Sequence, residues 1–411
     1  MIRRPARAAA ALLATSLLLA ACGAGDGGNT KPKAARPAQH PVFDQPLDRQ
    51  VFLALRQTQK AGGARFTQTL TFESKKGRAV QTTSGRLDFA GGTGEARVTW
   101  SVPKKYPDAA KAAMLGSTPG RTNADASGSF LVDRQSIRYR AGSADYWLRY
   151  TVGDDGATAG SDAVDRLLGT ESPIGGTLLE GIGGAEATAG KTEGQGRTYR
   201  AEMPATVAWE LFPQDLRDEL TVQGMASSRT APLPLTVSVD GQGRIVHAVV
   251  DLSSTLGRKG SALHDVTSLR MELTLSAHGT AAPSSATPQG PTREANDAVL
   301  RLRAVKTGKC VDFGTGLREA RMVVGVPCSG PHDGRVFDQL SLGTGAFPGG
   351  DAAQKRARRA CRGAYDGAPS GWTSESAEKD TYWYMWSGES DWRESGEGRV
   401  TCYVVTRTGA A

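Results

Sequence analysis

The segment LPLTVSVDGQGRIVHAVVDL, residues 233–252, contains the clearest β-hairpin signal in the sequence. Apolar residues occupy every second position of Leu233–Val239, and a second apolar run follows in Arg244–Leu252. Four turn-forming residues, Asp240 to Gly243, separate the two runs. Period-two alternation places the apolar side chains of a strand on one face, and Asp and Gly between two such runs favour a hairpin. This stretch therefore predicts two antiparallel strands with one apolar face.

Similar strands lie on both sides of this hairpin in the sequence. Alternation is clear in three further segments, Phe66–Glu73, Ala96–Val102 and Ser268–Ser276. Further strand candidates are 130–140, 145–152 and 197–203. Helical spacing predicts a helix over 47–55, and further helical stretches are expected near 161–168 and 205–220. Because a sheet with one apolar face needs a cover, the sequence predicts an α+β fold. We expect a curved antiparallel sheet, an open half-barrel, with capping helices.

The composition narrows the class of protein. A chain of 411 residues with 39% apolar residues is long enough for two or three domains. Its 51 glycines favour turn-rich antiparallel structure. The net charge of +8 falls to +5 without Arg3, Arg4 and Arg7, which lie in a segment that we expect to be removed. A positive charge this small and dispersed does not indicate nucleic-acid binding.

Residues 1–21 have the features of a bacterial lipoprotein signal peptide. Three arginines precede an apolar run, 8–21, that is too short to span a bilayer. The run ends in LAACG, residues 19–23, which resembles a lipobox. The resemblance implies that Cys22 is acylated and becomes the new N-terminus, and two acyl chains suffice for stable anchoring. We therefore expect a protein anchored to the cell membrane through Cys22, on its extracytoplasmic face, with residues 22–44 as a flexible tether.

Cysteine placement divides the remaining chain into two modules. Residues 45–278 contain no cysteine, and residues 279–299 are rich in Pro, Ser, Thr and Ala, which predicts a linker. Residues 300–411 contain Cys310, Cys328, Cys361 and Cys402. Their spacings of 18, 33 and 41 residues lack the close pairs of a zinc site. An even number of cysteines in an exported chain predicts two disulfides.

The faces of the expected elements predict the disulfide pairing. Cys310 and Cys328 flank a hairpin-like segment. Cys361 lies on the alanine-rich face of an expected helix, and Cys402 lies on the apolar face of an expected strand, Arg399–Val405. Two inward-facing cysteines on packed elements can reach the Cα separation of about 5.5–6 Å that a disulfide needs. We predict Cys310–Cys328 and Cys361–Cys402, which make 300–411 a small disulfide-stabilised α+β domain.

The order of elements in 45–278 resembles that of the LolA-like lipoprotein carriers and the LppX/LprG-like glycolipid-binding lipoproteins. An opening helix, a β-meander, a helical excursion and a final hairpin and strand follow one another in this order. In these families the fold is an unclosed barrel capped by helices, with an apolar cavity for acyl chains. The resemblance implies an acyl-chain lipid as ligand. The alternative is a filled core with a surface for another envelope protein.

Short motifs in 300–411 resemble the septum-formation-related domain of high-GC Gram-positive envelope proteins. They are GKC (308–310), VPCSGPHD (326–333), FPG (347–349) and RVTC (399–402), together with Trp392. The resemblance implies a link to division septa and supplies no catalytic residue. The family pattern usually carries a carboxylate or a short polar group where Arg335 stands. A partner surface at that position would therefore have the opposite charge.

Candidate partner-binding residues form two groups. The first group is His332, Asp333 and Arg335, in and beside the VPCSGPHD motif. The second group consists of four cations within roughly 100° of arc on the helix around Cys361, opposite its alanines. These cations are Lys355, Arg358, Arg359 and Arg362. They are suited to binding lipid headgroups or an anionic wall polymer.

The sequence contains no strong catalytic or cofactor motif. The patterns G-x-S-x-G and H-E-x-x-H are absent. AEATAGKT, residues 185–192, fits a permissive phosphate-loop pattern, but a strand is expected after it instead of the required helix. We expect no cofactor, no metal and a non-enzymatic binding or scaffolding module. The alternative is an envelope hydrolase or transferase that uses His332 and a nearby carboxylate.

Overall fold

The computed structural model describes residues 39–115, 122–124, 126–133, 135–142, 144–151, 176–204, 207, 232–256, 260–280, 288–315, 322–377 and 380–406. These residues all belong to one compact unit, Gln39–Ala411. The signal peptide, Cys22, the helical stretch expected near 161–168 and, apart from residue 207, the one near 205–220 lie outside the described residues. None of the described helices is long and apolar enough to cross a membrane.

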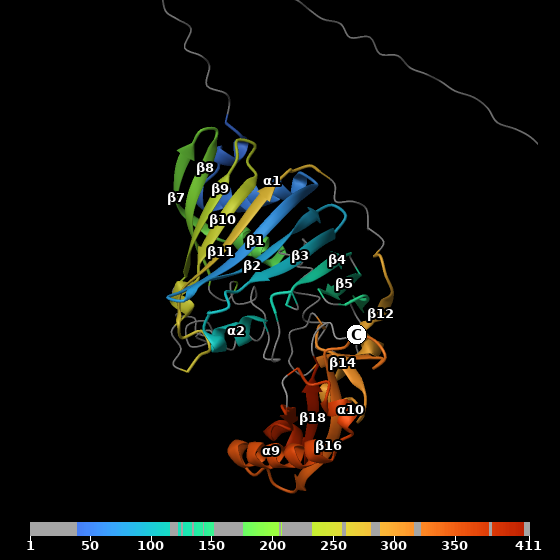
Figure 1. Cartoon of the computed structure of the whole chain (residues 1–411). Coiled ribbons are helices and arrows are strands. Elements are labelled where there is room, and N and C mark those ends of the chain that lie inside the picture. The colour runs from blue at the N-terminus through green and yellow to red at the C-terminus, as the bar shows by residue number, and fades with distance from the viewer. Residues whose placement is uncertain are drawn as a thin grey trace, which may run out of the picture. The chain divides into compact units, whose positions relative to one another are not determined.

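Within the described residues, twelve strands form one open sheet. Figure 1 shows its arrangement. The strand order is β12-β6-β5-β4-β3-β2-β1-β11-β10-β9-β8-β7, and the two ends of this order do not pair, so the sheet does not close into a barrel. All neighbouring strands are antiparallel except β12, which is parallel to β6. The strands are β1 (Gly63–Ser74), β2 (Gly77–Asp88), β3 (Thr93–Ser101), β4 (Gly128–Val132), β5 (Ser136–Ala141), β6 (Trp147–Thr151), β7 (Glu186–Glu193), β8 (Gly196–Met203), β9 (Leu233–Val239), β10 (Ile245–Asp251), β11 (Val266–Ser276) and β12 (Thr292–Glu294).

The central hairpin forms as its sequence predicts. Strands β9 and β10 pair antiparallel, and buried and less buried residues alternate along β9. The Asp240 carboxylate accepts hydrogen bonds from the backbone N–H groups of Gln242 and Arg244, at 2.9 and 3.0 Å. Gly243 has a φ of 74°, a conformation that favours glycine. An Asp at the first turn position and a Gly at the last therefore fix this turn.

The predicted strand 130–140 is divided in the structure. The Asp133 carboxylate accepts hydrogen bonds from the backbone N–H groups of Gln135 and Ser136, at 2.9 and 2.7 Å. This local bonding forms a turn between β4 and β5, as Asp side chains commonly do. The phosphate-loop pattern at 185–192, in contrast, lies almost entirely in strand β7, and the strand expected after it is β8.

The apolar face of the large sheet carries one continuous hydrophobic core. Each of β1 to β11 contributes buried apolar side chains, for example Phe72, Leu87, Trp100, Val132, Ile137, Leu148, Ala187, Tyr199, Val237, Val250 and Leu273. Buried residues of α1 (Leu47–Lys60), α2 (Asp108–Leu115) and α4 (Gly176–Gly183) belong to this core as well. The fold is thus the expected α+β arrangement of an open, mainly antiparallel sheet with helices on its apolar side.

Helix α1 is held against the sheet by polar contacts as well as by its apolar side chains. The Tyr199 hydroxyl on β8 donates to the Gln50 side-chain oxygen at 2.7 Å. At the other end of α1, the backbone N–H of Ile245 on β10 donates to the Thr58 hydroxyl at 2.8 Å. The helix ends before Gly62, whose φ of 86° is a conformation that favours glycine.

The predicted tether and linker both contribute folded segments. Pro41–Asp44 form a short 3-10 helix in which Val42 and Phe43 are buried, so the last residues of the predicted tether pack on the folded unit. Within the predicted linker, β12 extends the large sheet and α8 (Ala295–Ala298) follows it directly. The Arg149–Glu294 ion pair, 2.9 Å long, also connects this segment to β6.

Six strands form a second sheet in the order β13-β15-β14-β16-β18-β17. They are β13 (Val299–Arg301), β14 (Cys310–Asp312), β15 (Met322–Val326), β16 (Gly334–Thr344), β17 (Trp383–Trp386) and β18 (Glu397–Val405). The helices of this part are α9 (Gly350–Gly367), α10 (Ser370–Thr373) and α11 (Glu389–Ser395). Short 3-10 helices are Ser253–Thr255 and Leu302–Ala304.

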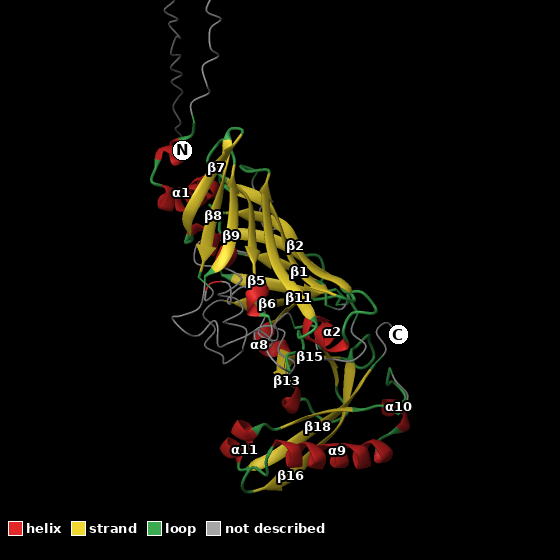
Figure 2. Ribbon diagram, turned by 90° about the vertical axis from the view of Figure 1, so that its left-hand side faces the viewer, coloured by secondary structure: helices red, strands yellow, loops and turns green. Residues whose placement is uncertain are grey.

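Helix α9 lies against β16 and β18 (Figure 2). Its inner face is completely buried at Ala353, Ala357 and Cys361, because alanines allow the helix to approach the strands closely. The disulfides are Cys310–Cys328 and Cys361–Cys402, with Cα separations of 5.2 and 5.5 Å. This is the predicted pairing, and the second bond joins the buried face of α9 to the terminal strand.

Candidate functional site

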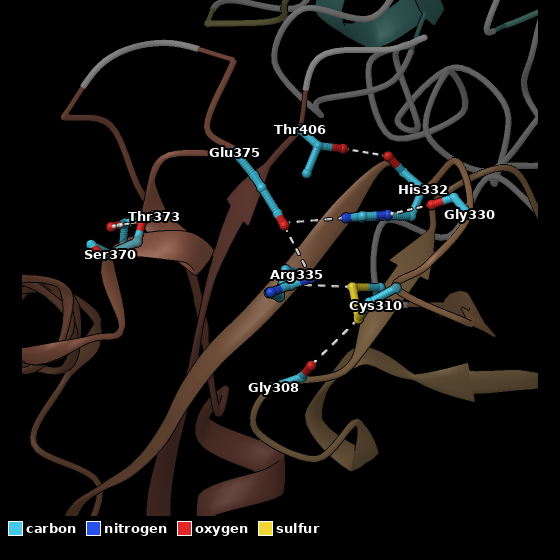
Figure 3. Close-up of polar contacts among 10 residues, drawn as sticks. Gly308, Cys310, Gly330, His332, Arg335, Ser370, Thr373, Glu375 and Thr406 are labelled. Carbon is cyan, nitrogen blue, oxygen red and sulfur yellow. Dashed lines mark hydrogen bonds and ion pairs between the residues drawn. A yellow bond between two sulfur atoms is a disulfide. The ribbon is translucent and has the colours of Figure 1, made fainter. Parts of the chain in front are cut away.

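The VPCSGPHD motif leads into a cluster of charged side chains around Glu375 (Figure 3). One oxygen of the Glu375 carboxylate lies 3.0 Å from an Nη of Arg335, at the start of β16. The other oxygen lies 3.4 Å from Nε2 of His332, in the turn that precedes β16. Glu375 follows α10, so the cluster joins two segments that are 40 or more residues apart in sequence.

Both ring nitrogens of His332 face hydrogen-bond acceptors. Nδ1 lies 2.9 Å from the backbone oxygen of Gly330, and Nε2 faces Glu375. The side chain is 9% exposed, and the backbone oxygen of His332 accepts a hydrogen bond from the Thr406 hydroxyl. This geometry suits a residue that connects the turn before β16 to Thr406, directly after β18.

Arg335 lies inside the fold. Its side chain is 11% exposed, its Nε donates to Sγ of Cys310 at 3.2 Å, and its guanidinium lies 5.8 Å from the centre of the Trp372 ring. Arg335 is directly opposite Cys310 in the β14–β16 pairing, which brings it beside the Cys310–Cys328 disulfide. The positive charge of Arg335 is therefore paired within the chain with Glu375.

The structure separates the predicted partner residues into two environments. His332, Asp333 and Arg335 are covered wholly or partly by the chain's own residues, whereas the four cations of α9 are exposed. None of these four cations forms an ion pair with another described residue. The Asp333 carboxylate is engaged within the fold, because it accepts a hydrogen bond from the backbone N–H of Phe313 at 2.9 Å. Of the predicted partner residues, the four on α9 are thus the exposed ones.

A second polar cluster, which the sequence analysis did not identify, lies around Asp312 at the end of β14. The Tyr146 hydroxyl donates to the Asp312 carboxylate at 2.8 Å. Burial raises the pKa of Asp312 to about 6, and nearby Asp333 adds to this rise, while the hydrogen bond from Tyr146 opposes it. Burial also raises the pKa of Tyr146, whose ring lies 4.1 Å below the Arg293 guanidinium.

The residues after Asp312 pack closely on strands β5 and β6. The Tyr150 hydroxyl donates to the backbone oxygen of Thr315 at 2.5 Å. A Cβ atom on Gly314 would lie 2.6 Å from the Cβ of Ala141, so a larger residue could not be accommodated without movement. Because Tyr146 and Asp312 are 166 residues apart, no local sequence pattern could have indicated this contact. The segment 312–315 thus packs against β5 and β6.

The described residues show no further arrangement typical of catalysis or metal binding. No three His, Cys, Asp or Glu residues among them are grouped to hold a metal ion. His332 is the histidine that the sequence analysis considered for acid–base chemistry, and both of its ring nitrogens are engaged. The geometry around it therefore favours a structural role over proton transfer.

Comparisons with known proteins place this fold beside bacterial lipoproteins only at low similarity. No family model matches the chain, and no curated protein matches it either. Among solved structures, LprF from Mycobacterium bovis shares 14% identity over 60% of this chain and 98% of its own, with a TM-score of 0.32. Lipoprotein LppX from Mycobacterium tuberculosis shares 14% over 57% and 97%, with a TM-score of 0.27. The MucA/MucB complex of Pseudomonas aeruginosa gives 11% over 89% and 100%, with a TM-score of 0.23.

The geometry of the described residues defines a protein with two β-sheets of different size. It combines an open, one-sided twelve-stranded sheet with a smaller sheet that carries two disulfides. Within the described residues its polar clusters stabilise loops and strand ends. The exposed α9 cations are a feature whose role the packing of the described residues does not explain.

Proposed function

We propose that this chain is a lipid-anchored protein of the cell envelope that binds an acyl-chain lipid on its large sheet and does not transform it. The observation that supports this proposal is the apolar face of an unclosed sheet, to which every strand from β1 to β11 contributes. Removing such a face from water is favourable by about 25 cal/mol per Å². An acyl chain can cover apolar side chains as well as a helix can.

The open edge gives a physical route for such a ligand. In a closed barrel, hydrogen bonds around the whole circumference fix the interior. In this sheet β7 and β12 are edges, so helices on the apolar face can move away from the strands without breaking hydrogen bonds between the strands. A ligand would then lie between the sheet and its helices.

Anchoring through Cys22 completes the proposed function. The lipobox-like LAACG would provide one acylation site 17 residues before the folded unit, which begins at Gln39. Two acyl chains on Cys22 would hold the protein stably at the extracytoplasmic face of the membrane. The ligand-binding sheet would therefore be presented close to the source of acyl-chain lipids.

We further propose, from the motifs of residues 300–411, that this part directs the protein to division septa. A fluorescent fusion of the full chain should then concentrate at division sites. Uniform fluorescence around the cell would contradict this part of the proposal and would leave lipid binding unaffected.

Tryptophan substitution in the sheet tests the lipid-binding proposal. Val250 on β10 and Met271 on β11 are directly opposite each other, and each is 1% exposed. If an acyl chain occupies this face, Met271→Trp or Val250→Trp fills its space and abolishes uptake of a fluorescent fatty acid with little loss of stability. In a filled core the same change would overpack the interior, which typically costs about 1–3 kcal/mol.

The control is Thr274→Trp, at an exposed position of β11 on the opposite face of the sheet. This variant should take up the fatty acid like the wild type. A marked loss of thermal stability in the Met271 variant, together with no uptake by the wild type, would contradict the proposal.

A further inference from the structure

Helix α9 presents an exposed row of positive charge, which we call the basic face and define as Lys355, Arg358, Arg359 and Arg362. All four residues are exposed, and they fall within roughly 100° of arc around the helix axis. The helix is an unbroken segment of 18 residues (Figure 2), so the basic face is presented along one rigid element.

The basic face is not explained by the stability of α9. Lys355 and Arg359, and likewise Arg358 and Arg362, are four residues apart, and like charges at this spacing destabilise a helix. Within the described part of the chain none of the four has an acidic ion-pair partner. The acidic residues of the helix, Asp351 and Asp366, lie in its first and last turns, four residues from Lys355 and Arg362, but form no ion pair with them. Arg358 and Arg359, between these two cations, have no acid at either spacing of three or four residues on the helix. A repulsive cluster in the middle of the helix therefore points to an external anion.

The opposite face of α9 determines how such an anion can be bound. Ala353, Ala357 and Cys361 are completely buried against the sheet, and the Cys361–Cys402 disulfide holds them there. The helix cannot turn an apolar face outward and insert it into a bilayer. It can only bind through its charged side chains, and guanidinium groups suit phosphate oxygens because they form paired hydrogen bonds.

We propose that the basic face adsorbs to anionic phospholipid headgroups at the surface of the membrane. A straight row of cations matches a flat, multiply charged surface. None of the exposed residues of α9 is aromatic, so the surface lacks the stacking groups typical of single-strand nucleic-acid binding. The proposal rests on the anchoring part of the proposed function, which keeps the chain at the membrane, and does not depend on acyl-chain uptake.

The test uses the unit Gln39–Ala411, which contains both sheets and all described cores but no acylation site. It should sediment with phosphatidylglycerol vesicles and not with pure phosphatidylcholine vesicles, and added salt should release it. Arg358→Gln with Arg359→Gln should weaken partitioning about thirtyfold, since each cation near an anionic surface contributes a factor of about five. Glutamine is a good helix former, so the fold should be retained.

The matched control is Lys75→Gln with Lys76→Gln, two exposed cations in the turn between β1 and β2. This pair removes the same charge and should leave vesicle binding almost unchanged. If both double variants lose vesicle binding equally, binding depends only on the net charge of the protein, and the proposal is overturned. Absence of wild-type binding to phosphatidylglycerol at low salt, or binding to a soluble polyphosphate that the vesicles do not displace, would overturn it too. Fatty-acid uptake, measured separately, distinguishes this failure from that of the lipid-binding proposal.

Discussion

At the scale of single residues, the most informative group is the buried carboxyl of Asp312. Its pKa rises from 3.8 to about 6 on folding, mainly because burial disfavours the charged form. The folded state therefore holds the proton more tightly than the unfolded state. This contribution to stability is fully present below pH 3.8 and is lost as the pH rises through about 6.

Asp312→Asn should consequently stabilise the protein at neutral pH. The asparagine stays uncharged, and its side-chain oxygen can still accept the hydrogen bond from Tyr146. At pH 7.5 we expect the free energy of unfolding to exceed that of the wild type by up to about 3 kcal/mol, since each pKa unit corresponds to about 1.4 kcal/mol. Urea unfolding of both proteins at several pH values measures the difference.

The same pair of proteins at low pH provides the control for this prediction. Near pH 4 the wild-type carboxyl is largely protonated in the folded state, so the two stabilities should converge. A difference that is constant from pH 4 to pH 8 would show that the charge on Asp312 does not matter.

At the scale of secondary-structure elements, the Cys361–Cys402 disulfide fixes α9 to β18. Cys361→Ala with Cys402→Ala should lower the free energy of unfolding by about 4 kcal/mol, because the chain-entropy model assigns this amount to a loop of 41 residues. The corresponding loss for Cys310–Cys328, with a separation of 18 residues, is about 3 kcal/mol. Denaturant unfolding of each double variant measures these values.

Peptide mapping without reduction checks the pairing itself. A fragment in which Cys328 is joined to Cys361 or Cys402 would contradict it. In both disulfide variants, the unfolding of the second sheet should also become less cooperative than that of the large sheet. The reason is that neither disulfide includes a residue of β1 to β12.

The elements that the sequence predicts well are those with a local, periodic signal. The β9–β10 hairpin follows from its alternation and its Asp–Gly turn, and the Cys361–Cys402 pairing follows from the faces of a helix and a strand. Contacts between distant segments have no such signal. The Glu375 partner of Arg335 is 40 residues away, so the sequence left this arginine as a surface candidate when it is in fact buried. Strand β12 was not predicted either, because it lies in a stretch whose composition indicates a linker.

At the scale of the whole molecule, the account requires that the folded unit be anchored through Cys22. Cys22→Ser removes the acylation site without changing any residue of the folded unit, so membrane retention should be lost while the fold remains. Cell fractionation after metabolic labelling with an alkyne fatty acid measures both acylation and retention. A variant that still labels and still sediments with membranes would contradict the anchor.

The most direct test of the central claim is mass spectrometry of organic extracts from the purified mature protein. Covalently attached acyl chains stay with the protein, so the extract contains only bound lipid. We predict a stoichiometric acyl-chain lipid in the extract of the wild type and of Thr274→Trp, and a strongly reduced amount in that of Met271→Trp. An extract of the wild type without any acyl-chain lipid would contradict the claim that the apolar face of the large sheet is a lipid-binding surface.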